Sequence, residues 1–145
     1  MECFAGNKSL QLARYPNLKL DGSDRYHGAW LHVDYVQNSS SGLFHINGSD
    51  SQLFKRALEW QKHGGNSTWM HGYWGFDWAE NHVHIESIRL ANSSLLVQVD
   101  RKTPPNYPMR ANARWYAENL LSELDLSSEY WVSRQISSDI LPFVP

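Results

Sequence analysis

A chain of 145 residues is long enough to bury a core of its own but hardly long enough for two domains. Its 13 basic and 15 acidic residues give a formal charge of −2, which argues against nucleic acid or a membrane surface as a partner. No apolar run is long enough for a transmembrane helix, and the single cysteine, Cys3, excludes an internal disulfide. The unusual feature is the supply of flat side chains, with seven Trp, seven Tyr and five Phe.

Alternating apolar and polar residues predict strands along most of the chain. Residues 2–14 alternate around the turn Gly6-Asn7, as a hairpin does. Further strands are predicted at residues 29–36, 43–46, 68–74, 82–90, 95–99 and 129–133. The strands 82–90 and 95–99 are expected to pair across Asn92-Ser93-Ser94, and the proline-rich residues 103–108 are expected to form a rigid loop.

Two segments have the spacing of a helix. The first begins near Ser51 and has Leu53, Ala57, Leu58 and Trp60 at its apolar positions. Ser49 or Asp50 is the expected N-cap, and Gly64-Gly65 the expected end. The second covers residues 111–124, with apolar positions at Trp115, Leu120, Leu121 and Leu124. The expected architecture is therefore mainly β with two short helices.

Five Asn-X-Ser/Thr triplets, more than chance supplies in this composition, favour exposed loops in a secreted glycoprotein. The candidate glycosylation sites are Asn7, Asn38, Asn47, Asn66 and Asn92. Turns rich in Ser and Asn also produce such triplets without any function, and residues 1–20 contain no signal peptide. The triplets therefore favour an extracellular location.

The spacing His82, His84, Glu86 is the most metal-like in the chain. On a strand all three side chains project from one face, and two imidazoles with one carboxylate can bind zinc. The alternative is a half-exposed strand whose other face, Val83 and Ile85, is buried. Because no fourth ligand is identified, no metal or other cofactor is expected.

Aromatic residues concentrate at residues 69–78, where the candidate glycan-binding residues are Trp69, Tyr73, Trp74, Asp77 and Trp78. Exposed flat rings beside polar groups suit the apolar face of a sugar ring. The same rings, if buried, form the core of a small β domain. Since Tyr73 and Trp74 point to opposite faces of a strand, one ring can be exposed while the other is buried.

Catalytic patterns are weak. Asp77, Glu80 and Glu86 are the carboxylates nearest the aromatic residues, and glycoside hydrolysis uses two carboxyl groups on either side of a sugar. Nothing in the sequence indicates the environment of a general acid. The chain contains no Gly-X-Ser-X-Gly elbow and no glycine-rich phosphate loop.

Five segments carry longer motifs. Residues 10–17 read LQLARYPN, residues 71–79 read HGYWGFDWA, and residues 118–125 read ENLLSELD. Residues 129–134 read EYWVSR and residues 141–145 read LPFVP. In this order they resemble the motifs LxLAR(Y/W)PN, GYW–DWA, xNLLxELD, EWYxDR and LYFxP of secreted right-handed parallel β-helix proteins. These are the pectin-lyase-like proteins related to glycoside hydrolase family 141.

The resemblance implies cap strands of a right-handed parallel β-helix at residues 1–17, a small β-rich insertion domain at 18–78, and a return to the start of the β-helix at 79–145. It also implies that the catalytic carboxylates lie on repeated coils expected beyond Pro145, so it assigns no catalytic residue here. The chain departs from the family where Ser127-Ser128 replaces a Pro-Gly turn and where Ser133 stands in place of Asp.

Three functions follow as hypotheses. In the first, the chain is the N-terminal portion of a secreted, glycoside hydrolase-like protein. It caps the β-helix, lines a glycan groove and is not catalytic alone, and its partners are a glycan or polysaccharide and the missing coils. In the second it is a stand-alone carbohydrate-binding module. In the third it is a truncated gene product without function. The expected groove residues are Trp69, Tyr73, Trp74, Asp77 and Trp78. The alternative is that these residues form the core behind the groove.

Overall fold

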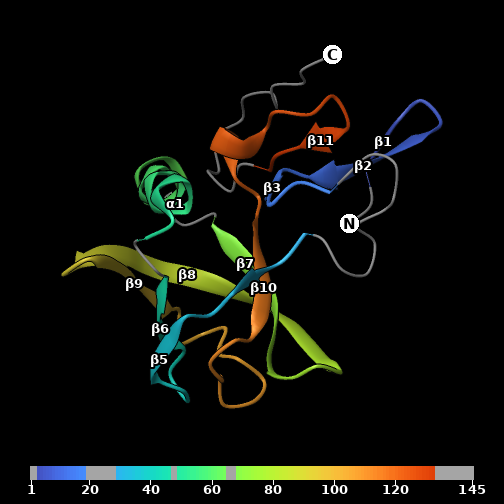
Figure 1. Cartoon of the computed structure of the whole chain (residues 1–145). Coiled ribbons are helices and arrows are strands. Elements are labelled where there is room, and N and C mark those ends of the chain that lie inside the picture. Colours follow the sequence, from blue (N-terminus) through green and yellow to red (C-terminus); the bar gives the residue numbers. More distant parts are fainter. Residues whose placement is uncertain (1–2, 19–28, 47–48, 65–67, 133–145) are drawn as a thin grey trace.

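The computed structural model describes residues 3–18, 29–46, 49–64 and 68–132, which are mainly β (Figure 1). The strands are β1 (Cys3–Ala5), β2 (Lys8–Leu12), β3 (Arg14–Tyr15), β4 (Leu31–His32), β5 (Tyr35–Asn38), β6 (Leu43–Ile46), β7 (Trp69–Phe76), β8 (Ala79–Ala91), β9 (Ser94–Val99), β10 (Arg114–Glu118) and β11 (Glu129–Tyr130). One α-helix, α1 (Ser51–Gly64), and one 3-10 helix, η2 (Leu121–Glu123), accompany them. Within these ranges no helix has the length and apolar character needed to cross a membrane.

The large sheet has eight strands and is antiparallel throughout. Its order is β3-β10-β7-β8-β9-β6-β5, and β4 also pairs with β10. The long strand β8 joins its two halves, because its first part pairs with β7 and its second part with β9. The pairing of β8 with β9 has a register shift between Ile85 and Ser87, next to the point where β8 stops pairing with β7 and begins to pair with β9.

A second, small sheet has the order β1-β2-β11 and lies at one end of the molecule (Figure 1). The β1–β2 hairpin turns at Gly6, whose positive φ of 60° suits a residue without a Cβ. The pair β2–β11 is the only parallel one in the described ranges. It brings residues near the two ends of the described chain side by side.

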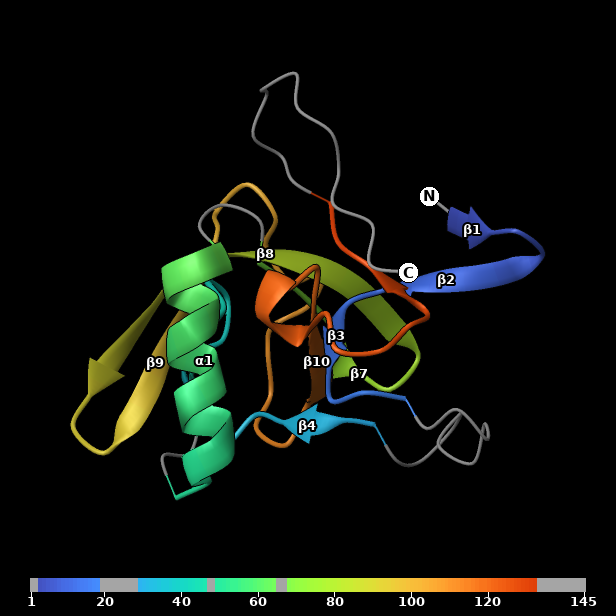
Figure 2. The same ribbon diagram turned by 90° about the horizontal axis from the view of Figure 1, so that it is seen from above.

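Helix α1 begins at a side-chain cap and packs against β8, β9 and η2 (Figure 2). Asp50 Oδ1 accepts hydrogen bonds from the backbone N–H groups of Gln52 and Leu53 at 3.1 and 3.0 Å. The helix buries Leu53, Ala57 and Trp60, whereas Leu58 is 39% exposed. The predicted helix and its Asp50 cap are therefore confirmed, and the predicted position of Leu58 on the apolar face is wrong.

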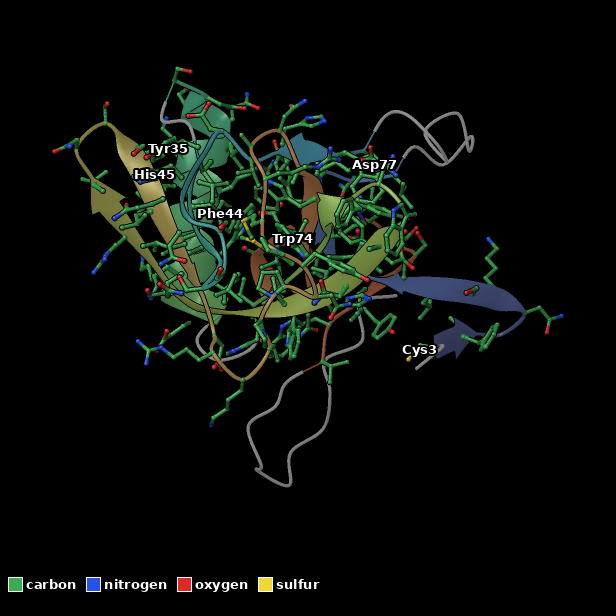
Figure 3. The ribbon with its side chains drawn as sticks, turned by 90° about the horizontal axis from the view of Figure 1, so that it is seen from below. Cys3, Tyr35, Phe44, His45, Trp74 and Asp77 are labelled. Carbon is green, nitrogen blue, oxygen red and sulfur yellow. The ribbon has the colours of Figure 1, made fainter. Side chains whose placement is uncertain are left out.

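Aromatic rings fill the core between α1 and the large sheet. Trp60, Trp74 and Trp115 are fully buried, and the ring of Phe44 lies 6.0 Å from that of Trp74 and 6.1 Å from that of Trp115. Figure 3 shows Phe44 and Trp74 near the centre of the molecule. The indole N–H of Trp60 donates to Glu123 Oε1 at 2.8 Å, which ties α1 to η2 through a carboxylate that is only 2% exposed.

The prediction of a second helix at residues 111–124 is wrong. This segment forms β10 followed by the short helix η2. Positive φ angles at Asn112 (61°) and Asn119 (58°) interrupt any helix on both sides of β10. Trp115 and Ala117 enter the core, and the backbone pairs with β7, so tertiary pairing overrides the helical spacing.

Most predicted strands are confirmed within a few residues. The hairpin at 2–14 forms β1 and β2, residues 43–46 form β6, and the predicted pairing of 82–90 with 95–99 is that of β8 with β9. The predicted single strand at 29–36 is instead split into β4 and the first half of β5, on either side of Val33 and Asp34. The strand predicted at 129–133 is confirmed only over Glu129–Tyr130.

The predicted fold class is confirmed at the level of a mainly β protein. The described strands form open, largely antiparallel sheets and do not show the cap of a parallel β-helix. The predicted domain boundaries stay predictions, and the one at residue 78 falls in the turn between β7 and β8.

Candidate functional site

The strands β8, β7 and β10 present two chemically different faces. One face is apolar and carries Met70, Trp74, Val83, Trp115 and Ala117, all buried in the core. The opposite face, here called the polar face, follows the alternation of the same strands. It carries Trp69, His71 and Tyr73 from β7, Glu80, His82 and His84 from β8, and Arg114, Tyr116 and Glu118 from β10.

The strand register aligns the side chains of the polar face in rows. Glu118, Trp69 and His84 are opposite one another on β10, β7 and β8. Tyr116, His71 and His82 form the next row. Directly opposed residues bring their side chains close together. Accordingly the Trp69 and His84 rings lie 5.2 Å apart, and the His71 and His82 rings 4.4 Å apart.

A continuous hydrogen-bonded chain runs across this face from one carboxylate to another. Glu118 Oε1 lies 2.5 Å from Nδ1 of His82. Nε2 of His82 lies 3.0 Å from Nδ1 of His71, and Nε2 of His71 lies 3.1 Å from Glu80 Oε2. Each carboxylate therefore contacts one outer nitrogen of the histidine pair, and the two inner nitrogens face each other.

The two histidines are satisfied only when they share one proton between them. Ionised carboxylates accept and do not donate, so Nδ1 of His82 and Nε2 of His71 each carry a proton. The inner nitrogens need one further proton to form their hydrogen bond. With none their lone pairs repel, and with two their N–H groups collide. All three hydrogen bonds therefore form together when the pair carries a single positive charge between two ionised carboxylates.

The surroundings assign that charge to His82. The hydrogen bond to Glu118 raises the pKa of His82 above the ordinary histidine value, against the opposing effect of burial. Burial lowers the pKa of His71, and the charge on His82 lowers it further. A hydrogen bond from Tyr73 lowers the pKa of Glu80, which keeps that end of the chain an acceptor.

Rings and guanidinium groups hold the histidine pair in place. The Tyr116 ring stacks on His71 at 4.9 Å with 12° between their planes, and the Arg14 guanidinium lies 3.5 Å from the Tyr116 ring centre. Burial raises the pKa of Tyr116 to about 12. The half-buried ring of Trp30 lies 6.1 Å from His71 and 5.3 Å from Tyr116. This packing fixes the orientation of His71 without contributing a further hydrogen bond to it.

A cavity of about 360 Å³ adjoins the Glu118 end of this chain. It lies between the large and small sheets and is lined by Leu12, Trp69, His82, Glu118, Asn119, Tyr130 and Val132. Its walls are mainly apolar, whereas Glu118 and His82 supply charge. Such a combination is typical of sites for small ligands.

A separate exposed aromatic cluster, formed by Phe76, Trp78 and Tyr107, lies at the β7–β8 turn. Phe76 and Trp78 stack with ring centres 5.4 Å apart and 14° between planes, and Tyr107 meets both rings edge-on at 5.1 and 5.5 Å. Their exposed fractions are 47%, 71% and 38%. A Cβ on Gly75 would approach Tyr107 Cβ to 2.5 Å, so the loop that carries Tyr107 can pack here because residue 75 is glycine.

Charged groups border the exposed aromatic cluster. Asp77, in the same turn, accepts a hydrogen bond from Arg110 at 2.6 Å. Arg114 donates to the backbone carbonyl of Asp77 at 3.4 Å, and its guanidinium lies 4.1 Å from the Tyr73 ring centre. The cluster therefore has hydrogen-bonding groups of both kinds beside its apolar rings.

The five predicted glycan-binding residues occupy three different environments. Trp78 and Asp77 are exposed at the β7–β8 turn, and Trp69 lines the cavity. Tyr73 is half-buried on the polar face between them. Trp74 belongs to the core, with 1% exposure and its indole N–H donating to the Asn81 carbonyl at 3.0 Å. The two alternatives for these rings are glycan contact and core packing, and Trp74 packs in the core.

The predicted metal ligands do not converge. His82 contacts Glu118 and His71, His84 contacts Asp100 Oδ2 at 3.1 Å, and the side chain of Glu86 is exposed. Within the described ranges no group of three or more His, Cys, Asp or Glu side chains is arranged to hold a metal ion. The predicted carboxylates also separate, since Asp77 pairs with Arg110 and Glu80 with His71.

Three of the candidate glycosylation sites fall on described residues, and all three are exposed. Asn7 lies in the β1–β2 turn, Asn38 at the end of β5, and Asn92, with a φ of 57°, in the β8–β9 turn. Asn47 and Asn66 lie outside the described residues.

Sequence reasoning missed His71, Glu118 and Tyr107. His71 lies two residues from both Trp69 and Tyr73, so alternation alone places it on their face. Its contact with His82 depends on the register of β7 with β8. Glu118 lies within the segment for which the spacing wrongly predicts a helix, and Tyr107 comes from a loop with no periodic signal.

In comparisons with known proteins, no family model, curated protein or solved structure matches this chain. The relationship to parallel β-helix proteins therefore stays a prediction.

Proposed function

We propose that this chain binds a glycan through the exposed aromatic cluster of Phe76, Trp78 and Tyr107, as the N-terminal portion of a secreted, carbohydrate-active β-helix protein. The observation that carries the proposal is the stack of Phe76 on Trp78, with the latter ring 71% exposed. Single exposed apolar side chains are ordinary, whereas contiguous exposed apolar patches such as these three contacting rings are typical of interaction sites.

The chemistry of the patch suits a sugar ring. Its flat faces can cover the C–H groups of a pyranose, and a rigid aromatic side chain loses little conformational entropy on binding. Asp77 and Arg110, 2.6 Å apart beside the rings, offer an acceptor and donors for hydroxyl groups. Direct contact by Trp78 and Asp77 is thus the part of the predicted site that the arrangement supports best.

Two further features support the context of a secreted β-helix protein. Strand β2 pairs with β11 in parallel, as neighbouring coils of a parallel β-helix do. The side chains of Asn7, Asn38 and Asn92 are exposed, as glycosylation requires. In this context the chain caps the open end of the β-helix, covers its unpaired edges and lines one wall of a glycan groove, without catalysis of its own.

One observation favours the second candidate, a stand-alone carbohydrate-binding module. All three rings of the cluster come from one hairpin and one loop of this chain. The contacts among the three rings are therefore all made within the described part of this chain.

The proposal is tested by titrating the chain with a panel of plant, fungal and animal oligosaccharides and comparing two aromatic variants. Trp78→Ala is expected to weaken binding at least about tenfold, the usual cost of removing a central aromatic contact. Tyr35→Ala is the matched control, because Tyr35 is also exposed (59%) and lies on the opposite side of the molecule from Asp77 (Figure 3). It is expected to bind as the unmodified chain does.

Equal affinities for Trp78→Ala and the unmodified chain would remove the exposed aromatic cluster from the proposal. If no oligosaccharide in the panel binds the folded chain, glycan binding fails altogether, and the hypothesis of a truncated gene product gains support.

A further inference from the structure

We infer that the cavity between the two sheets is a second carbohydrate subsite, in which the Glu118 carboxylate accepts a hydrogen bond from a hydroxyl group of a neutral sugar ring. The inference takes its ligand class from the proposed function, but it concerns a different site and different residues.

Glu118 provides the first argument. The residue is only 8% exposed and lines the cavity. Its Oε1 is bound to His82, and no described residue donates a hydrogen bond to its Oε2. A carboxylate oxygen held at the edge of an apolar cavity has lone pairs that require a donor, which water or a ligand can supply there.

The charge of the site selects the kind of donor. Glu118 is negative, but at the cavity it directly contacts the protonated Nδ1 of His82, whereas Glu80 lies at the far end of the histidine pair. The positive charge of the pair therefore offsets the negative charge of Glu118 where the ligand would bind. A bare cation therefore gains little net attraction, whereas a neutral hydroxyl group forms a charge-assisted hydrogen bond to the carboxylate. His82 is half exposed, which leaves this side of the cavity open to solvent.

The apolar walls of the cavity favour a ligand that also has apolar C–H surface. The rings of Trp69 and Tyr130 and the aliphatic side chains of Leu12 and Val132 surround the charged pair. Flat apolar walls with one strong acceptor match a molecule that has both C–H faces and hydroxyl groups, as a pyranose does. Asn119 shapes the wall, since its amide group hydrogen-bonds both backbone groups of Val132, at 3.0 and 2.8 Å.

The experiment follows two sites separately by NMR during titration with the neutral monosaccharides glucose, galactose, mannose and xylose. Methyl resonances of Leu12 and Val132 report on the cavity, and the indole N–H resonance of Trp78 reports on the exposed aromatic cluster. We expect at least one sugar to shift the methyl resonances. Glu118→Gln, which keeps the shape of the side chain and can still accept from His82, is expected to weaken this response about ten- to a hundredfold.

Glu86→Gln is the matched control, because Glu86 is an exposed carboxylate on the same strand as His82 and does not line the cavity. It is expected to leave the methyl response within about twofold. Leu12→Trp fills the cavity without removing a charge and serves as a second variant if Glu118→Gln does not fold. It is expected to abolish the response of Val132.

The outcomes separate the two proposals. A response of Trp78 without any response of Leu12 and Val132 overturns the cavity subsite and leaves the proposed function standing. A cavity response that Glu118→Gln does not change also overturns it. A cavity response without one at Trp78 supports the subsite and counts against the exposed aromatic cluster. The absence of any response at either site overturns both.

Discussion

Replacing Trp74 tests whether the aromatic residues of the β7–β8 hairpin include a ring that packs in the core. Trp74 is 1% exposed, its ring lies 6.0 Å from that of Phe44, and its indole N–H donates to the Asn81 carbonyl at 3.0 Å. Trp74→Ala removes a fully buried ring and leaves a cavity, which costs about 3–5 kcal/mol of the free energy of unfolding. Domains have about 5–15 kcal/mol in total, so the variant is expected to fold with a clearly reduced stability.

The same hairpin offers a matched control in Trp78, which is 71% exposed. Trp78→Ala is expected to change the free energy of unfolding by no more than about 0.5 kcal/mol. A third variant, Trp74→Phe, keeps a ring in the core but leaves the Asn81 carbonyl without its donor. This loss is expected to lower the free energy of unfolding by about 1–3 kcal/mol.

The assay is equilibrium unfolding in urea, followed by far-ultraviolet circular dichroism so that the loss of a tryptophan does not change the probe. The reasoning predicts the order of stability Trp78→Ala, Trp74→Phe, Trp74→Ala, from most to least stable. If Trp74→Ala unfolds with the same midpoint as Trp78→Ala, the Trp74 ring is not part of the core and the arrangement of β7 described above is wrong.

Two other perturbations test the helix cap and the histidine pair. Asp50→Ala is expected to cost about 0.5–2 kcal/mol, because two backbone N–H groups lose their acceptor, whereas Asp50→Asn is expected to restore most of the stability in the same urea assay. His82, whose pKa is raised in the fold, contributes stability that is full below its unfolded pKa of about 6.5 and is lost as the pH rises through its folded pKa. The difference in melting temperature between the unmodified chain and His82→Gln is therefore expected to shrink as the pH is raised from about 6.5, and a constant difference would refute the shared proton. The charged and titratable groups that face the pair in this experiment are Arg14, Tyr73, Glu80, Arg114, Tyr116 and Glu118.

Local pattern predicted much of the fold because the relevant forces act over a few residues. The short apolar runs at residues 43–46 and 95–99 and the cap at Asp50 need only neighbouring side chains to be interpreted. The opposite faces of Tyr73 and Trp74 follow from the period of a strand, whichever partner the strand has.

Residues 111–124 show where this reasoning fails. Their apolar spacing fits a helix, but Trp115 gains its burial by pairing with β7 and by meeting Phe44 from β6. These partners are distant in the sequence, and the left-handed conformations of Asn112 and Asn119 have no clear periodic signal. The same error concealed Glu118, which faces His82 only because the segment is a strand.

The sequence by itself determined the mainly β character, the helix at Ser51–Gly64 with its cap, and the concentration of aromatic rings at residues 69–78. Only the tertiary structure decided that Trp74 is core while Trp78 is exposed, and that His71 and His82 join Glu80 to Glu118 in one hydrogen-bonded chain. The reason is that burial and hydrogen bonding depend on the register between strands. A shift of one residue in β7 against β8 would turn His71 into the core and Trp74 out of it.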